Sequence, residues 1–174
     1  MNKKIILINN IIALFILNFN YGLCSELKSS VFSNNGFIPV KYSCDGANIS
    51  LPLVFSSIPD GTVSLALILV DPDAPVKNFV HWVIYNIPRD QNELVEGIPK
   101  SELLEGGIRQ GLNGFNQSGY YGPCPPRGET HRYIFKLYAL DTTIDLNNAT
   151  KAQLLSAIKG HVIGKGKLIG KYKS

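Results

Sequence analysis

The sequence predicts a mainly β protein, an antiparallel β-sandwich with a few short peripheral helices. Residues 63–70 form a run of eight that is apolar apart from Ser64 and rich in branched side chains, which is typical of a central strand covered on both faces. Residues 79–87 and 132–140 are also strand-like, and Gly, Pro and Asn separate these segments. Because strand patterns outnumber helical ones, the fold class is mainly β.

The first 24 residues have the pattern of a secretory signal peptide. A basic MNKK start precedes an apolar run over residues 5–19, and Gly22 and Cys24 place small residues at −3 and −1 of a cleavage site. The run is shorter than the roughly 20 residues of a membrane-spanning helix. We therefore expect a signal peptide over 1–24, one domain over 25–174, and export to the periplasm or the medium. A lipoprotein anchored through Cys24 is the alternative, disfavoured because Leu23 precedes it.

The charge of the chain does not indicate a nucleic-acid partner. Removal of residues 1–24 takes away Lys3 and Lys4 and no acid, which lowers the formal charge from +4 to +2. Lysines near the C-terminus alternate with Gly, Leu and Ile, as in a strand with one solvated face.

Two cysteines, Cys44 and Cys124, remain after the predicted cleavage. An even pair in an exported protein favours a disulfide. Two separate buried thiols are the alternative that the sequence leaves open.

The period of two in a strand assigns side chains to faces. In the segment 79–87 it places Phe79, His81, Val83 and Tyr85 on one face, and Val80, Trp82 and Ile84 on the other. In the segment 132–140 and the residue before it, it places His131, Tyr133, Phe135 and Leu137 together.

The C-terminal part predicts one helix and a last strand. Asn148 or Thr150 caps a helix over 151–159, Gly160 ends it, and residues 165–172 form a strand. Another helical turn is expected within 101–104.

The central strand ends in the sequence DPDAP, residues 71–75. Pro72 and Pro75 cannot continue a central ladder, so a rigid turn is expected, with Asp71–Pro72 a candidate cis bond. Asp71 and Asp73 then lie at the end of the strand. In the simplest interpretation both carboxylates only make hydrogen bonds within the turn.

Two histidines begin the neighbouring strands. His81 and His131 each stand among apolar or aromatic residues, and in an antiparallel sheet these strand starts can meet the end that carries Asp71. A histidine near a carboxylate holds its proton more readily, so such a cluster could receive an anion. A single strand histidine is more commonly an ordinary core residue.

Two other chemistries are less favoured. The sequence contains no G-x-S-x-G, and Cys124 with His131 fits no protease signature. A metal site built from Asp71, Asp73, His81 and His131 would lack an established ligand spacing. We therefore expect no catalytic residue, no metal and no cofactor.

Four segments together resemble the phosphatidylethanolamine-binding protein family, in its bacterial Raf-kinase-inhibitor-like branch. They are DPDAP (71–75), HW (81–82), GPCPPRGETHRYIF (122–135) and YALD (138–141), preceded by CDGANIS (44–50). The resemblance extends from about Leu27 to the C-terminus and implies an antiparallel β-sandwich with a small pocket at one edge.

The resemblance implies a pocket for phosphate-like anions and phospholipid head groups, without an established reaction. The matching positions are Asp71, His81, Gly122, Pro125, His131 and Tyr133, with Asp73 shaping the turn. It also implies a protein partner such as a protease, a kinase or a host protein. The alternative is a protease inhibitor or other interaction module that acts through its surface, with a vestigial pocket.

Three features depart from the family pattern. Phe79 stands where many members have tryptophan, and residues 50–55, SLPLVF, replace a proline and a tryptophan of the family motif. The C-terminal helix that borders the pocket in eukaryotic members is not evident in this tail. These departures affect the pocket wall rather than the fold, so a more open pocket is expected.

Overall fold

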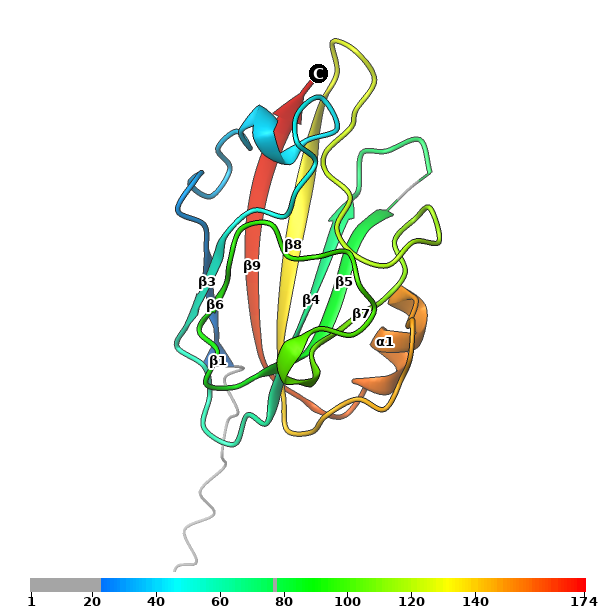
Figure 1. The fold of residues 1–174 in the computed structure, drawn as a ribbon. Coiled ribbons are helices and arrows are strands. Elements are labelled where there is room, and N and C mark those ends of the chain that lie inside the picture. The colour runs from blue at the N-terminus through cyan, green and yellow to red at the C-terminus, as the bar shows by residue number, and fades with distance from the viewer. Residues whose placement is uncertain (1–22, 77) are drawn as a thin grey trace, which may run out of the picture.

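The computed structural model describes residues 23–76 and 78–174, which form two packed β-sheets with one α-helix (Figure 1). The larger sheet has the strand order β1-β9-β8-β4-β5-β7 and the smaller one β2-β3-β6. The large-sheet strands are β1 (Leu23–Cys24), β4 (Ser64–Asp71), β5 (Phe79–Pro88), β7 (Arg109–Gln110), β8 (Thr130–Leu140) and β9 (Val162–Lys173). The small-sheet strands are β2 (Glu26–Lys28), β3 (Leu53–Ser56) and β6 (Glu93–Leu94).

The mainly β prediction is confirmed, and among the described strands every neighbouring pair is antiparallel except one. β1 pairs with β9 in parallel, and β1 lies within the segment expected to be a signal peptide. The cleavage itself stays a prediction.

The main core lies between the two sheets. Leu53 and Phe55 of β3 share one hydrophobic cluster with Leu67, Trp82 and Phe135 of the large sheet. β4 is buried along its whole length because its other face is covered too. It is therefore the central strand that the apolar run predicts.

A second core lies under the helix α1 (Lys151–Ala157) on the outer face of the large sheet. Ile68, Val83 and Tyr85 pack there against Leu154 and Ile158. Figure 1 shows α1 beside β5 and β7, at the end of the molecule away from the C-terminus.

The helix begins where the capping residues predict. The Thr150 side chain accepts a hydrogen bond from the Gln153 backbone N–H, and the Gln153 side chain accepts one from the Thr150 N–H. This reciprocal capping box satisfies two donors that the first turn leaves free. The chain leaves the helix through Gly160 at φ 90°, a left-handed conformation that glycine adopts without strain.

Two short 3₁₀ turns complete the described elements, at Val40–Tyr42 and Glu105–Gly107. The helical turn expected within 101–104 is wrong by several residues. Residues 101–104 are extended or irregular, because Leu103 makes a β-bridge to Arg109 and Leu104 donates to the Ile108 carbonyl.

A β-bulge at His81 corrects the expected faces of β5. Leu69 pairs with Trp82 and Val70 with Val80, so His81 is the extra residue opposite β4. Val80 consequently packs with the second core, beside Val83 rather than beside Trp82. The His81 ring lies 5.2 Å from the ring of Tyr133, a member of the main core.

The faces expected for β8 are confirmed. Tyr133, Phe135 and Leu137 lie together in the main core, and His131 is buried at the entrance of the same strand. No helix in the described part of the chain is long and apolar enough to cross a membrane.

The capping box generates the first prediction. Thr150→Ala removes the acceptor for the Gln153 N–H and should lower the free energy of unfolding by about 1 kcal/mol, measured by urea denaturation. Thr142→Ala is the matched control, since that hydroxyl bonds only the adjacent Thr143 carbonyl, and it should cost less than about 0.5 kcal/mol. Equal losses in the two variants would contradict a capping role.

Candidate functional site

A cavity of about 220 Å³ lies where β4 ends and β5 and β8 begin. The loops that surround it, between β4 and β5 and between β7 and β8, lie at the upper right in Figure 1. Its lining residues are Asp71, Ala74, Pro75, Val76, Phe79, His81, Phe115, Tyr121, Cys124, Pro126 and His131.

A buried Asp–His pair forms the polar part of the cavity. The Nδ1 atom of His131 lies 2.7 Å from Oδ2 of Asp71, and the two side chains are 5% and 4% exposed. Asp71 ends β4 and His131 begins the neighbouring β8, so the sheet itself brings them together. The other Asp71 oxygen accepts the backbone N–H groups of Asp73 and Ala74. Both oxygens of this buried carboxylate therefore accept hydrogen bonds.

His131 has a second carboxylate on its other nitrogen. Nε2 lies 3.2 Å from Oε2 of Glu129, a side chain that is 61% exposed. An ionised carboxylate only accepts hydrogen bonds, so both ring nitrogens donate to these partners when the ring is an imidazolium, and the two carboxylates favour that form. Burial opposes this charge, but the hydrogen bonds to Asp71 and Glu129 outweigh it and raise the pKa of His131.

His81 has the opposite protonation behaviour. Its Nδ1–H donates to the Tyr121 carbonyl at 2.8 Å, and the Tyr121 N–H donates back to the His81 carbonyl. Burial lowers the pKa of His81, although its backbone acceptors and Asp71 favour the charged form. The site therefore combines an imidazole that favours its charged form with one that favours its neutral form, in which Nε2 of His81 carries a lone pair.

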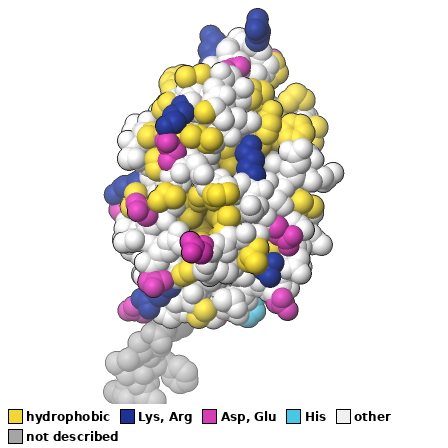
Figure 2. Space-filling view, in the orientation of Figure 1, with side chains coloured by type: hydrophobic (Ala, Val, Ile, Leu, Met, Phe, Trp, Pro, Cys, Tyr) yellow, Lys and Arg dark blue, Asp and Glu magenta, His cyan; other side chains and the backbone are white. Residues whose placement is uncertain are grey.

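The remaining walls are aromatic and apolar. The rings of Phe79, His81, Phe115 and Tyr121 form a closed series of contacts, with neighbouring centroids 4.6 to 6.2 Å apart. Val76 and Phe115 are exposed at the rim, at 72% and 51%. Figure 2 shows apolar side chains gathered at the upper right, over these loops.

Asp73 stands beside the cavity and has a structural partner. Its carboxylate accepts the Arg132 backbone N–H and two guanidinium donors. These side-chain bonds lower the pKa of Asp73 to about 2. The pair joins the 71–76 turn to β8. The turn contains no cis bond, since all described peptide bonds are trans, so the expected cis Asp71–Pro72 bond is wrong.

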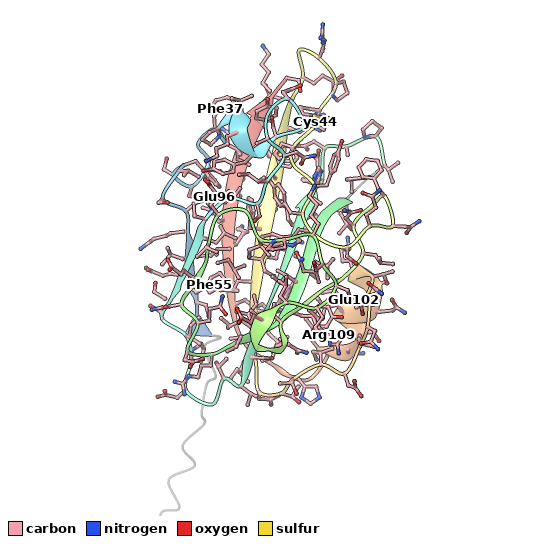
Figure 3. The ribbon with its side chains drawn as sticks, in the orientation of Figure 1. Phe37, Cys44, Phe55, Glu96, Glu102 and Arg109 are labelled. Atoms are coloured by element: carbon pink, nitrogen blue, oxygen red, sulfur yellow. A yellow bond between two sulfur atoms is a disulfide. The ribbon has the colours of Figure 1, made fainter. Side chains whose placement is uncertain are left out.

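The proline-rich loop is fixed to the segment around Cys44. Cys44 and Cys124 form a disulfide with their Cα atoms 5.4 Å apart, as the sequence favoured, at the top of the molecule in Figure 3. The Cys44 N–H also donates to the Pro123 carbonyl, and the Gly122 N–H donates to Asn48 Oδ1. A Cβ at Gly122 would collide with the Tyr42 carbonyl oxygen, so only glycine permits this close packing.

The structure brings together three of the predicted site residues at the cavity surface, Asp71, His81 and His131. The other four, Asp73, Gly122, Pro125 and Tyr133, lie beside or behind this surface. Tyr133 is fully buried against the His81 ring, and burial together with the Asp71 charge raises its pKa. Pro125 is buried beneath the loop, while Pro126 reaches the cavity.

Sequence reasoning missed Glu129 and two residues of the aromatic wall, Phe115 and Tyr121. Glu129 stands two residues before His131, so the strand period could have placed both side chains on one side. Phe115 and Tyr121 come from a loop without periodicity and gave no such signal. Among the described residues, no group of three or more His, Cys, Asp or Glu could hold a metal ion.

Comparison with known proteins identifies relatives over most of the chain. Residues 28–173 match the family described as phosphatidylethanolamine-binding protein. A UPF0098 protein from Methanothermobacter thermautotrophicus is 51% identical over 149 residues, which cover 85% of this chain and 98% of the relative.

Two crystal structures are similar in fold and sequence. A phosphatidylethanolamine-binding protein homologue from Chlamydia trachomatis has a TM-score of 0.79 and 40% identity, covering 87% of this chain and 99% of that one. YbcL from E. coli, described as a member of the mammalian family, has a TM-score of 0.80 and 29% identity, with coverages of 86% and 98%.

The two histidines should titrate in a defined order. In an NMR titration of the imidazole resonances, His131 should lose its proton at higher pH than His81. Asp71→Asn should lower the pKa of His131, while Asp141→Asn, which removes the partner of His161, should leave it unchanged. The raised pKa stabilises the fold below about pH 6.5, and this contribution is lost as the pH rises through the folded pKa. A His131 that titrates below His81 would contradict this assignment.

The disulfide should stabilise the fold more than it shapes the site. Replacing both Cys44 and Cys124 by Ser should lower the free energy of unfolding by about 2–4 kcal/mol in guanidinium denaturation. The pKa of His131 should not change, because the hydrogen bonds donated by the backbone N–H groups at positions 44 and 122 still hold the loop. Wild-type protein in reductant should match the variant, and no loss in reductant would contradict the bond.

Proposed function

The chain belongs to the phosphatidylethanolamine-binding protein family, and we propose that it is a non-enzymatic protein whose cavity receives the phosphate group of a small ligand. The observation that carries this proposal is the buried pair of His131 and Asp71, whose atoms Nδ1 and Oδ2 lie 2.7 Å apart at the edge of a largely apolar cavity.

Charge and desolvation make this group an anion receptor. An imidazolium N–H that donates to an anionic oxygen forms a charge-assisted bond, which is stronger than a neutral one. Apolar walls exclude water and lower the local dielectric, which strengthens the attraction further. Asp71 supports the charge without occupying the outer nitrogen.

The walls favour a phosphate that carries an apolar substituent. Val76, Phe79 and Phe115 offer apolar surface beside the polar group, and two of them are exposed at the mouth. Small-ligand sites commonly combine such surface with a few directed polar groups. A protein partner, such as a protease, a kinase or a host protein, that covered this mouth would compete with the ligand.

The cavity provides no evident nucleophile for a reaction. Cys124, the cysteine of the lining, has no free thiol because its sulfur is bonded to Cys44. His81 and His131 are each hydrogen-bonded to acceptors, and neither activates a serine or cysteine. Binding rather than turnover therefore agrees best with the residues present.

We also propose that the protein works in an exported, oxidising compartment. A disulfide persists where thiols are not kept reduced, and the first 24 residues have the pattern of a signal peptide.

Phosphate binding tests the proposal. Wild-type protein should bind inorganic phosphate or phosphoethanolamine in calorimetric and NMR titrations, and His131→Gln should weaken binding about tenfold or more, since a charged hydrogen bond is lost. His161→Gln is the matched control, because His161 is exposed and bonds Asp141. Its affinity should stay within about twofold. If the wild-type protein binds neither inorganic phosphate nor phosphoethanolamine, the proposal is overturned.

A further inference from the structure

Both N–H donors of the proposed anion receptor are already occupied by carboxylates. Nδ1 of His131 donates to Asp71 at 2.7 Å and Nε2 to Glu129 at 3.2 Å. A ligand anion that bonds His131 must therefore take the place of one of them.

Asp71 is the fixed partner and Glu129 the exchangeable one. Asp71 is 4% exposed and also accepts two backbone N–H groups, so its displacement would leave three donors unsatisfied in a dry site. Glu129 is 61% exposed and makes the longer contact. When Glu129 turns toward solvent, water hydrates its carboxylate and Nε2 becomes free.

We infer that Glu129 is a tethered competitor that selects which anions enter the cavity, so that phosphate displaces it and simple carboxylates do not. This inference rests on the proposed function, because it concerns the ligand of the same site.

The local charges favour exchange over simple addition. Two carboxylates, Asp71 and Glu129, face one imidazolium, and the neighbouring Asp73 and Arg132 neutralise each other. Burial lowers the pKa of His81, and in its neutral form this ring adds no cation. An incoming anion would therefore be repelled by the net negative charge of Asp71, Glu129 and His131 together. If Glu129 turns away, the anion takes the place of its carboxylate and the net charge is restored.

A free carboxylate competes poorly with a tethered one. Glu129 stands two residues from His131, and a group held on so short a link has an effective concentration on the order of millimolar or higher. A free carboxylate makes the same single contact with Nε2 of His131 as Glu129 does, so the exchange yields no additional hydrogen bond. It must therefore exceed that concentration to bind.

A phosphate can make contacts that Glu129 cannot. In its monoanionic form it presents acceptor oxygens to the His131 N–H and a hydroxyl that can donate. The neutral His81, which also lines the cavity, has a lone pair on Nε2. A phosphate or phosphomonoester therefore complements the charged and neutral imidazoles together, and a carboxylate complements only one.

The test compares inorganic phosphate with acetate at pH 6.0 on four proteins: wild type, Glu129→Gln, Glu129→Asp and the control Glu105→Gln. Glutamine keeps the size and removes the charge, whereas aspartate keeps the charge and shortens the reach to His131. Glu105 is an exposed acid in the 3₁₀ turn, distant in sequence from the cavity. NMR confirms that His131 stays protonated in each protein.

Wild type and Glu105→Gln should bind phosphate and show no acetate binding at millimolar concentration. Glu129→Gln and Glu129→Asp should bind phosphate about two- to fivefold more tightly, because this change in affinity corresponds to the free energy of an exposed ion pair. Both should also acquire acetate binding. If Glu129→Asp binds phosphate and acetate as wild type does, the charge at position 129 acts only at long range, and the inference is overturned. A Glu129→Gln protein without any gain while wild type binds phosphate also overturns it. Absence of phosphate binding by all four proteins overturns the proposed function, and the inference with it.

Discussion

The rest of the site depends on one buried ion pair, His131 with Asp71. Burying two charges costs several kcal/mol per ion, and their attraction compensates only when the geometry is good and the other lone pairs are satisfied. Both conditions hold, since the contact is 2.7 Å and the second Asp71 oxygen accepts the N–H groups of Asp73 and Ala74. The pair fixes the turn after β4 against the start of β8, and the cavity forms between them. Removal of either partner would take away the contact that joins the end of β4 to the start of β8, so the pair holds the pocket's shape as well as its charge.

The two sheets serve this pair by fixing the strands that carry it. β4 is covered on both faces, so its end cannot shift without disturbing two cores. The bulge in β5 then turns His81 toward Tyr133 and the cavity, away from the helix-covered core. The third contributor, the loop 120–126, is held from outside by the disulfide and by bonds to Asn48 and Cys44. Its prolines leave little backbone freedom to lose when a ligand binds.

Local patterns predicted the parts of this arrangement that local physics determines. The alternation in β8 placed His131 with Tyr133, the residue types around Thr150 located the helix, and the central strand followed from its nearly continuous apolar run. Regular alternation put His81 on the wrong face, because a bulge adds a residue where tertiary packing requires it and leaves no mark in the period. The 3₁₀ turn at Glu105–Gly107 and the wall residues Phe115 and Tyr121 belong to loops whose shape depends on distant contacts. The isomer of the bond before Pro72 also depends on the folded turn, because the cis and trans forms of an X–Pro bond differ only slightly in free energy. The turn holds this bond in the trans form.

The two cavity histidines show how environment, rather than residue type, assigns chemical roles. Both are buried, and burial alone disfavours charge on each. His81 meets a neutral carbonyl, which cannot offset that cost, so its pKa falls. His131 meets two carboxylates, which more than offset it, so its pKa rises. The difference arises from which strand ends the sheet places together, because Asp71 neighbours β8 directly in the strand order. An antiparallel sheet that ends one strand in a carboxylate and begins the next in a histidine thus favours a positive charge in a largely apolar site. The carboxylate two residues before that histidine then determines how readily the charge is available to another anion.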